Sequence, residues 1–149
     1  MQALIAAGAG FLLAVLWFDL MFDVQVLRYR NDEVPEAVLA SIAGYYRRVT
    51  TEARPLNRLV TVAMLATLLA IVLQATSDDV ARWVSVVSAV AAAAPIGLAA
   101  TRTVPSAVRL GTRRDPVEVQ SWLARSVCRD HLVCLPAIAA LLVVQLVWG

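Results

Sequence analysis

The run LVTVAMLATLLAIVLQATS, residues 59–77, contains no charged side chain over 19 positions. At about 1.5 Å per residue, an α-helix of this length reaches roughly 28 Å, close to the ~30 Å thickness of a bilayer hydrocarbon core. Three further uncharged runs occupy residues 1–18, 83–101 and 132–149. Lipid offers no partner to a free backbone group, and the runs lack the alternation of a membrane β-barrel, so the sequence predicts four transmembrane helices.

The composition of the whole chain supports the same fold class. The 149 residues are 60% hydrophobic and 16% charged, with a mean hydropathy of +0.73, which excludes an ordinary soluble enzyme of this size. The net charge of +2 is too small for a nucleic-acid-binding surface, so no nucleic-acid partner is expected. We predict an all-α, polytopic four-helix bundle in the lipid bilayer, forming one transmembrane domain over residues 1–149.

The uncharged runs and the charges that flank them set the predicted boundaries. The spans are expected at about residues 3–27, 56–76, 81–102 and 128–148, with long connections at 28–55 and 103–127. The first run has no basic start and no small-residue cleavage site, so we expect an uncleaved span rather than a signal peptide.

Arginine supplies all 13 basic residues, and its distribution is strongly uneven. Six arginines lie in residues 28–58 and six in residues 102–129, whereas the short second connection has Arg82 alone, beside the acidic pair at 78–79. Basic connections are retained in the cytoplasm, so both termini are predicted to lie outside, with Trp83 and Trp148 at the outer boundary. The lysine-free composition, rich in alanine, valine and arginine, is typical of a GC-rich bacterial genome, so we expect a multi-pass protein of the bacterial inner (plasma) membrane.

Each cytoplasmic connection is predicted to carry an amphipathic surface helix. In the first connection, Asn31 or Asp32 is the N-cap candidate and Pro35 suits a first helical turn. Apolar and aromatic residues follow at helical spacing: Val38, Leu39, Ile42, Tyr45, Tyr46 and Val49. Tyr45 and Tyr46, followed by two arginines, are expected to anchor this helix at the lipid headgroups.

The other cytoplasmic connection, residues 103–127, contains a similar signal. Asp115 precedes Pro116, and Glu118 follows three residues after Asp115, which is a plausible capping arrangement for a helix that contains Trp122. The chain therefore divides into two halves, each with a span, a basic connection with a surface helix, and a second span.

The segment WFDLMFDVQ, residues 17–25, holds the most informative polar residues. Asp19 and Asp23 are four residues apart, so they share one helix face at the inner end of the first span. Charged groups in a membrane are costly and need partners or water; they either pair with arginines or form a functional site. The topology brings the third and fourth spans to the same depth, so we predict one polar cluster, made of Asp19, Asp23, Gln25, Arg102 and His131.

His131 is the only histidine, and its unperturbed pKa suits proton exchange near neutral pH. It could act as a base or a proton relay, or simply be satisfied by a neighbouring carboxylate. No metal site is predicted, because helical di-metal bundles use more carboxylates and a Glu-x-x-His pair. Cys128 and Cys134 are spread around one helix and are expected to be small apolar helix residues rather than a disulfide or a zinc site.

The chain resembles the anthrone-oxygenase-like family of small four-helix membrane proteins. The residues that carry the resemblance are Arg54-Pro55-Leu56, PIGLAATRTVPSAVRL at 95–110, and Trp122 followed by Arg129 and His131. It covers most of the chain from Val34 onward and assigns no catalytic residue. The resemblance implies a four-span fold and, for a few members, oxygenation of a polycyclic aromatic substrate without an obvious bound metal.

Two classes of function compete, and whether the protein is an enzyme stays open. In the first, a hydrophobic small molecule is bound or oxidised in a pocket lined by Trp17, Phe18 and Phe22, with Gln25 beside it. There the acid/base group is Asp19, Asp23 and His131, and Arg102 stabilises developing negative charge. In the second, the chain is an accessory or scaffold subunit of a larger membrane complex. An oligomeric transporter or channel, lined by Asp19 and Asp23, is a third hypothesis. The sequence names no cofactor.

Overall fold

In this computed structural model, which describes residues 1–29, 33–77 and 80–149, every regular element is a helix. The order along the chain is α1 (Gln2–Asp23), the 3₁₀ segment η1 (Val24–Arg28), α2 (Glu36–Arg47), the π segment η2 (Arg48–Glu52), α3 (Leu56–Ala75), α4 (Arg82–Leu98), the π segment η3 (Ala99–Thr103), α5 (Val104–Thr112) and α6 (Val117–Trp148). Four stretches are long and apolar enough to cross a membrane: Gln2–Arg28, Arg58–Ala75, Arg82–Thr112 and Val117–Trp148. The predicted all-α class with four such helices is confirmed.

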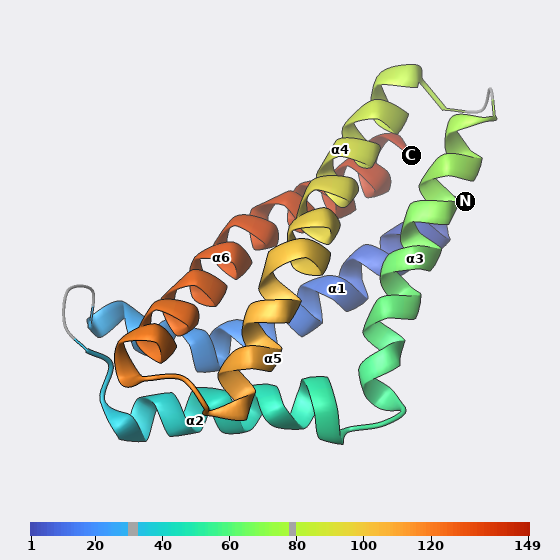
Figure 1. The fold of residues 1–149 in the computed structure, drawn as a ribbon. Coiled ribbons are helices and arrows are strands. Elements are labelled where there is room, and N and C mark those ends of the chain that lie inside the picture. The colour runs from blue at the N-terminus through green and yellow to red at the C-terminus, as the bar shows by residue number, and fades with distance from the viewer. Residues whose placement is uncertain (30–32, 78–79) are drawn as a thin grey trace.

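The four long helices run side by side, and α2 lies across one end of them (Figure 1). Both termini lie at the opposite end, near the connection between α3 and α4 (Figure 1). Two contacts fix this arrangement: the Gln2 side chain donates a hydrogen bond to the Gln145 carbonyl at 2.7 Å, and the rings of Trp83 and Trp148 meet edge to face at 5.6 Å.

Two apolar cores lie one above the other along the bundle. The first is formed among the four long helices by residues such as Ile5, Ile71 and Leu141. The second lies at the α2 end, where residues such as Leu39, Leu110 and Leu123 join α2, α5 and the start of α6. Large apolar side chains cover the outside of the long helices, including Leu65, Val90 and Leu146, each more than 60% exposed. Such a surface is compatible with lipid and would promote aggregation in water.

The connection at residues 103–127 differs from its predicted form. Helices α4, η3 and α5 are continuous over 31 residues, and α6 runs for 32 residues, so residues 103–127 extend two long helices instead of forming a separate surface helix. Pro116 takes the N-cap position of α6 without a side-chain cap, and Asp115 accepts two hydrogen bonds from Arg109. In the first connection, Pro35 is the N-cap of α2; the candidate caps Asn31 and Asp32 lie outside the described residues.

Candidate functional site

The polar site lies where the two cores meet. Asp19 and Asp23 are in the last turns of α1, Tyr45 and Tyr46 end α2, and His131 is in α6. The sequence brings these groups together because a spacing of four places both aspartates on the inner face of α1, while the apolar face of α2 packs against the same end of the bundle.

His131 lies between the two carboxylates. Its Nδ1 is 2.7 Å from Asp23 Oδ2, and its Nε2 is 3.7 Å from Asp19 Oδ2. The Asp23 side chain is fully buried, and those of Asp19 and His131 are 13% and 10% exposed. The short contact is a hydrogen bond; the longer one is within ion-pair distance when the imidazole is protonated, but it is too long for a hydrogen bond.

The two tyrosines donate further hydrogen bonds to the carboxylates. The Tyr45 hydroxyl donates to Asp19 Oδ1 and the Tyr46 hydroxyl donates to Asp23 Oδ1, each at 2.7 Å. Burial, with the nearby carboxylates adding to it, raises the pKa of both Tyr45 and Tyr46 well above the ordinary tyrosine value, so both stay protonated donors. The ring of Tyr45 also stacks on Phe22, with centroids 4.2 Å apart and planes 9° from parallel.

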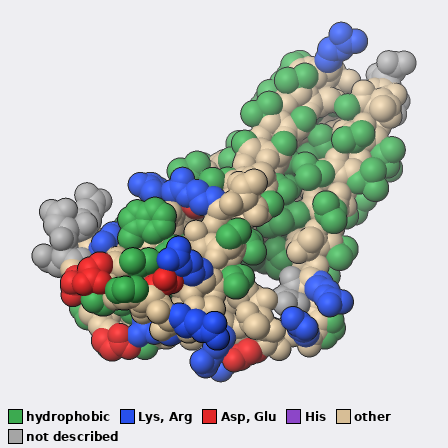
Figure 2. All heavy atoms as spheres, in the orientation of Figure 1, with side chains coloured by type: hydrophobic (Ala, Val, Ile, Leu, Met, Phe, Trp, Pro, Cys, Tyr) green, Lys and Arg blue, Asp and Glu red, His purple; other side chains and the backbone are tan. Residues whose placement is uncertain are grey.

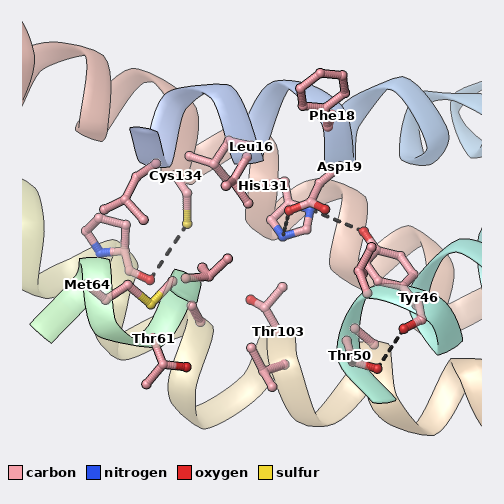
Figure 3. A pocket seen from close by; sticks show the side chains of 18 of the residues that line it. Leu16, Phe18, Asp19, Tyr46, Thr50, Thr61, Met64, Thr103, His131 and Cys134 are labelled. Atoms are coloured by element: carbon pink, nitrogen blue, oxygen red, sulfur yellow. Dashed lines mark hydrogen bonds and ion pairs between the residues drawn. The ribbon is translucent and has the colours of Figure 1, made fainter. Parts of the chain in front are cut away.

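A mostly apolar cavity of about 640 Å³ opens beside this group. Asp19, Tyr45, Tyr46 and His131 form its polar wall, and residues of α1, η2, α3, α4, η3, α5 and α6 form the rest, with Arg58 and three threonines among them. Figure 3 shows Asp19 and His131 together on one side, facing Met64, Thr61 and Thr103 across the cavity. The volume is in the range of small-molecule pockets, and few polar groups at one end of an apolar space are typical of such sites.

Arg102 and Gln25, both predicted to join the cluster, do not contact it. The Arg102 guanidinium donates to Ser126 Oγ at 2.9 Å and lies 3.2 Å from Asp130 Oδ1, while the hydroxyl of Thr103 donates to Asp130 Oδ2 at 3.2 Å. Arg102 is thus neutralised by its own carboxylate and faces away from the cavity polar wall. Gln25 bonds locally to the Phe22 carbonyl at 3.0 Å.

The predicted aromatic lining is also different in the structure. Trp17 is 63% exposed and does not line the cavity. Phe18 lies at the cavity edge but is 59% exposed, and its ring points away from the interior (Figure 3). Phe22 packs behind Tyr45. Trp17 and Phe18 are neighbours in sequence, so their side chains lie about 100° apart around the helix and cannot both point inward.

Sequence reasoning assigned Tyr45 and Tyr46 to the membrane surface, whereas both reach the site. The signal was present in the pattern Leu39, Ile42, Tyr46, which places Tyr46 on the buried face of α2. The tyrosine adjacent to it reaches Asp19 from the edge of that face. Thr103 and Asp130 were not assigned, because only the packed structure reveals which carboxylate a given arginine meets.

Both cysteines lie in α6. Cys128 and Cys134 are buried free thiols, and Cys134 lines the cavity, where its Sγ is 3.9 Å from the Pro95 carbonyl oxygen. Across residues 1–29, 33–77 and 80–149, no set of three His, Cys, Asp or Glu side chains is arranged to hold a metal ion.

No family model, no curated protein and no solved structure matches this chain.

Proposed function

We propose that this protein is a multi-pass membrane protein that binds a hydrophobic small molecule in its cavity and exchanges a proton with it through His131. One observation carries the proposal: the imidazole stands in the wall of a mostly apolar cavity with one nitrogen fixed by a buried carboxylate and the other on the cavity side of the site. A lone histidine in a packed core would not have an open volume of about 640 Å³ beside it.

The hydrogen bonds define the chemistry that the site can perform. When Nδ1–H is donated to Asp23, Nε2 carries the lone pair and can accept a proton from a bound molecule. The imidazolium that forms lies 2.7 Å from Asp23 and 3.7 Å from Asp19, and both carboxylates stabilise it. In this scheme His131 is the catalytic residue, and Asp23 is a positioning residue that holds the ring.

The reaction implied by the family resemblance, oxygenation of a polycyclic aromatic compound, fits a cavity of this size and apolar lining. Oxidation would require a co-substrate such as dioxygen; proton acceptance by His131 is the part that the chain itself would supply. Stabilisation of negative charge by Arg102 is not part of this proposal, because Asp130 already pairs with that guanidinium.

The composition supports a location in the bacterial inner membrane, and the charge distribution supports an orientation with the α2 end in the cytoplasm and both termini outside. Arginines gather at the α2 end of the molecule (Figure 2), whereas Arg82 begins α4 at the opposite end. Retention of basic segments in the cytoplasm gives this orientation. The apolar face of α2 is buried, and its exposed face with Arg47, followed by Arg48 in η2, would lie at the inner leaflet.

Two variants test ligand binding in the cavity. Met64→Trp should fill part of the space, because Met64 lines the cavity; Leu65→Trp, on the adjacent lipid-facing position with 61% exposure, is the matched control. The protein is purified in an uncharged detergent, and co-purified compounds are extracted and identified by mass spectrometry. We expect a hydrophobic compound with wild type and Leu65→Trp and at least about tenfold less with Met64→Trp.

Proton exchange is tested with naphthol, whose excited state is a strong acid. Bound naphthol should emit as its anion in the wild type and as the neutral molecule in His131→Phe. Equal binding and neutral emission in both proteins would remove the proton-accepting role. A stoichiometric protein partner together with no bound compound would instead favour the accessory-subunit hypothesis.

A further inference from the structure

The polar wall of the cavity presents acceptors, because its donor hydrogens are already committed. The hydroxyls of Tyr45 and Tyr46 are donated to Asp19 and Asp23. Across the cavity, the hydroxyl of Thr103 is donated to Asp130. When the imidazole is neutral, its Nδ1–H is donated to Asp23, because an ionised carboxylate only accepts. What then remains on this wall is the Nε2 lone pair of His131 and Asp19 Oδ2.

These two acceptors face each other without a bond between them. They are 3.7 Å apart, and among the described residues no hydrogen bond reaches Nε2, although the His131 side chain is nine-tenths buried. Nε2 is not sealed off from the cavity, so a ligand there can supply the donor that this ring nitrogen lacks.

We propose that the ligand of this cavity is a hydrophobic primary amine, bound as its ammonium ion. This inference rests on the proposed small-molecule function and names the chemical class of the ligand. One nitrogen placed about 2.8 Å from each of two acceptors 3.7 Å apart forms a feasible triangle, and it needs two hydrogens on that nitrogen. An ammonium group has three hydrogens, whereas a hydroxyl has one and can satisfy only one acceptor.

The charges around the site also favour a cationic ligand. The groups that face the polar wall are Asp19 and Asp23 from α1, Tyr45 and Tyr46 from α2, and His131 with the neighbouring Asp130 and Cys134 from α6. Asp130 is neutralised by Arg102, so two carboxylates and one imidazole are left, and they carry a net negative charge when both acids are ionised. Arg58, from the start of α3, also lines the cavity, but it is exposed, so water screens its charge. A cation inside the cavity would neutralise the excess, and the face of the Tyr45 ring opposite Phe22 could add a cation–π contact.

The test compares three probes with the same hydrophobic body: pyrenemethylamine, pyrenemethanol and pyreneacetic acid. Cavity-specific binding is the amount bound to wild-type protein in uncharged micelles minus the amount bound to Met64→Trp, because partition into the micelle is the same for both. We expect the amine to bind about tenfold more tightly than the alcohol, and the carboxylate to bind most weakly, because a charge-assisted hydrogen bond is stronger than a neutral one.

Asp19→Asn keeps the side-chain shape and removes the charge. It should lower amine affinity about tenfold and change alcohol affinity by about twofold or less. Glu118→Gln, on the exposed start of α6, removes one acidic charge elsewhere and should change neither affinity. If Asp19→Asn does not fold, the three probes on wild-type protein still decide the question.

The outcomes separate the two proposals. Equal cavity-specific binding of all three probes, or a preference for the alcohol or the carboxylate, would overturn the amine assignment and leave the small-molecule function standing. No cavity-specific binding of any probe would overturn both.

Discussion

Asp23 is the residue on which the site depends most. It is fully buried, and each of its two oxygens accepts one hydrogen bond, from the Tyr46 hydroxyl and from His131. A buried carboxylate without such bonds would be strongly destabilising, because it loses its hydration and gains nothing in return. The tyrosine hydroxyls are therefore needed as donors, and their protonation is part of the native structure.

The alkaline titration of the tyrosines tests this role. The pKa of Tyr45 and Tyr46 is raised in the folded protein, so their stabilising contribution is complete below the unfolded value of about 10 and is lost as the pH rises through the folded value. In the folded state, tyrosinate absorbance up to about pH 11 should be the same for wild type and for Tyr45→Phe/Tyr46→Phe. After unfolding, the wild type should show two more ionising tyrosines. Ionisation of two extra tyrosines in the folded wild type near pH 10 would contradict the buried donor role.

The sequence could place Asp19, Asp23 and His131 at one depth, because a spacing of four and the order of the spans determine depth. It could not assign Arg102. Adjacent residues on a helix point about 100° apart, so Asp130 and His131 cannot both face the cavity. The rotation of α6 in the packed bundle decides that His131 faces the cavity and that Asp130 faces η3, where it meets Arg102.

Gly8 allows α1 and α3 to approach closely at Thr67. A Cβ atom built at Gly8 would overlap the Oγ1 atom of Thr67 and lie 3.2 Å from its Cβ, whereas a Cβ at Gly10 would have nothing within 4 Å. Thr67 is buried and donates a hydrogen bond to the Ala63 carbonyl at 2.8 Å, so it cannot rotate away without losing that bond. Close contact at small residues is the usual way for helices to associate in membranes.

Substitution at these two glycines gives a matched test. Gly8→Ala should destabilise the protein by about 1–3 kcal/mol through overpacking, while Gly10→Ala should be neutral or slightly stabilising, because alanine favours a helix. Unfolding in mixed detergent micelles measures both. Thr67→Ala should rescue part of the Gly8→Ala loss in the double variant, and additive effects would argue against a direct contact.

Helix ends were harder to predict than helix existence. The uncharged runs locate the four apolar stretches, but each run ends by definition at the nearest charged residue, and a helix does not have to end there. The length of an apolar run matches the thickness of the hydrocarbon core, which is not the length of the helix. Arginine is a good helix former, and its long side chain reaches water, so a helix can continue through it. The helices that end at Thr112 and begin at Val117 therefore continue past the apolar stretch, which the sequence assigned to a connection and a surface helix.

The whole molecule combines an apolar bundle with a second, charged end. Continuous helices of 31 and 32 residues are about 46–48 Å long, so they exceed a hydrocarbon core of about 30 Å by several turns. The excess is at the α2 end, where the second core and most arginines lie. The site is located between the two cores, so a hydrophobic ligand could enter from the bilayer while its polar end stays near the interface.

This arrangement predicts opposite accessibility for the two ends of the bundle. Ser77→Cys, in the connection between α3 and α4, and Thr112→Cys, at the exposed end of α5, introduce thiols with little change of shape, and the native cysteines are buried. A membrane-impermeant maleimide should label Ser77→Cys in intact spheroplasts and Thr112→Cys only in inverted membrane vesicles, because the proposed orientation, from the retention of basic segments, puts the arginine-rich end in the cytoplasm. The reverse pattern would place the α2 end and the mouth of the site outside. Labelling of both positions from one side would mean that the α3–α4 and α5–α6 connections do not lie on opposite faces of the membrane.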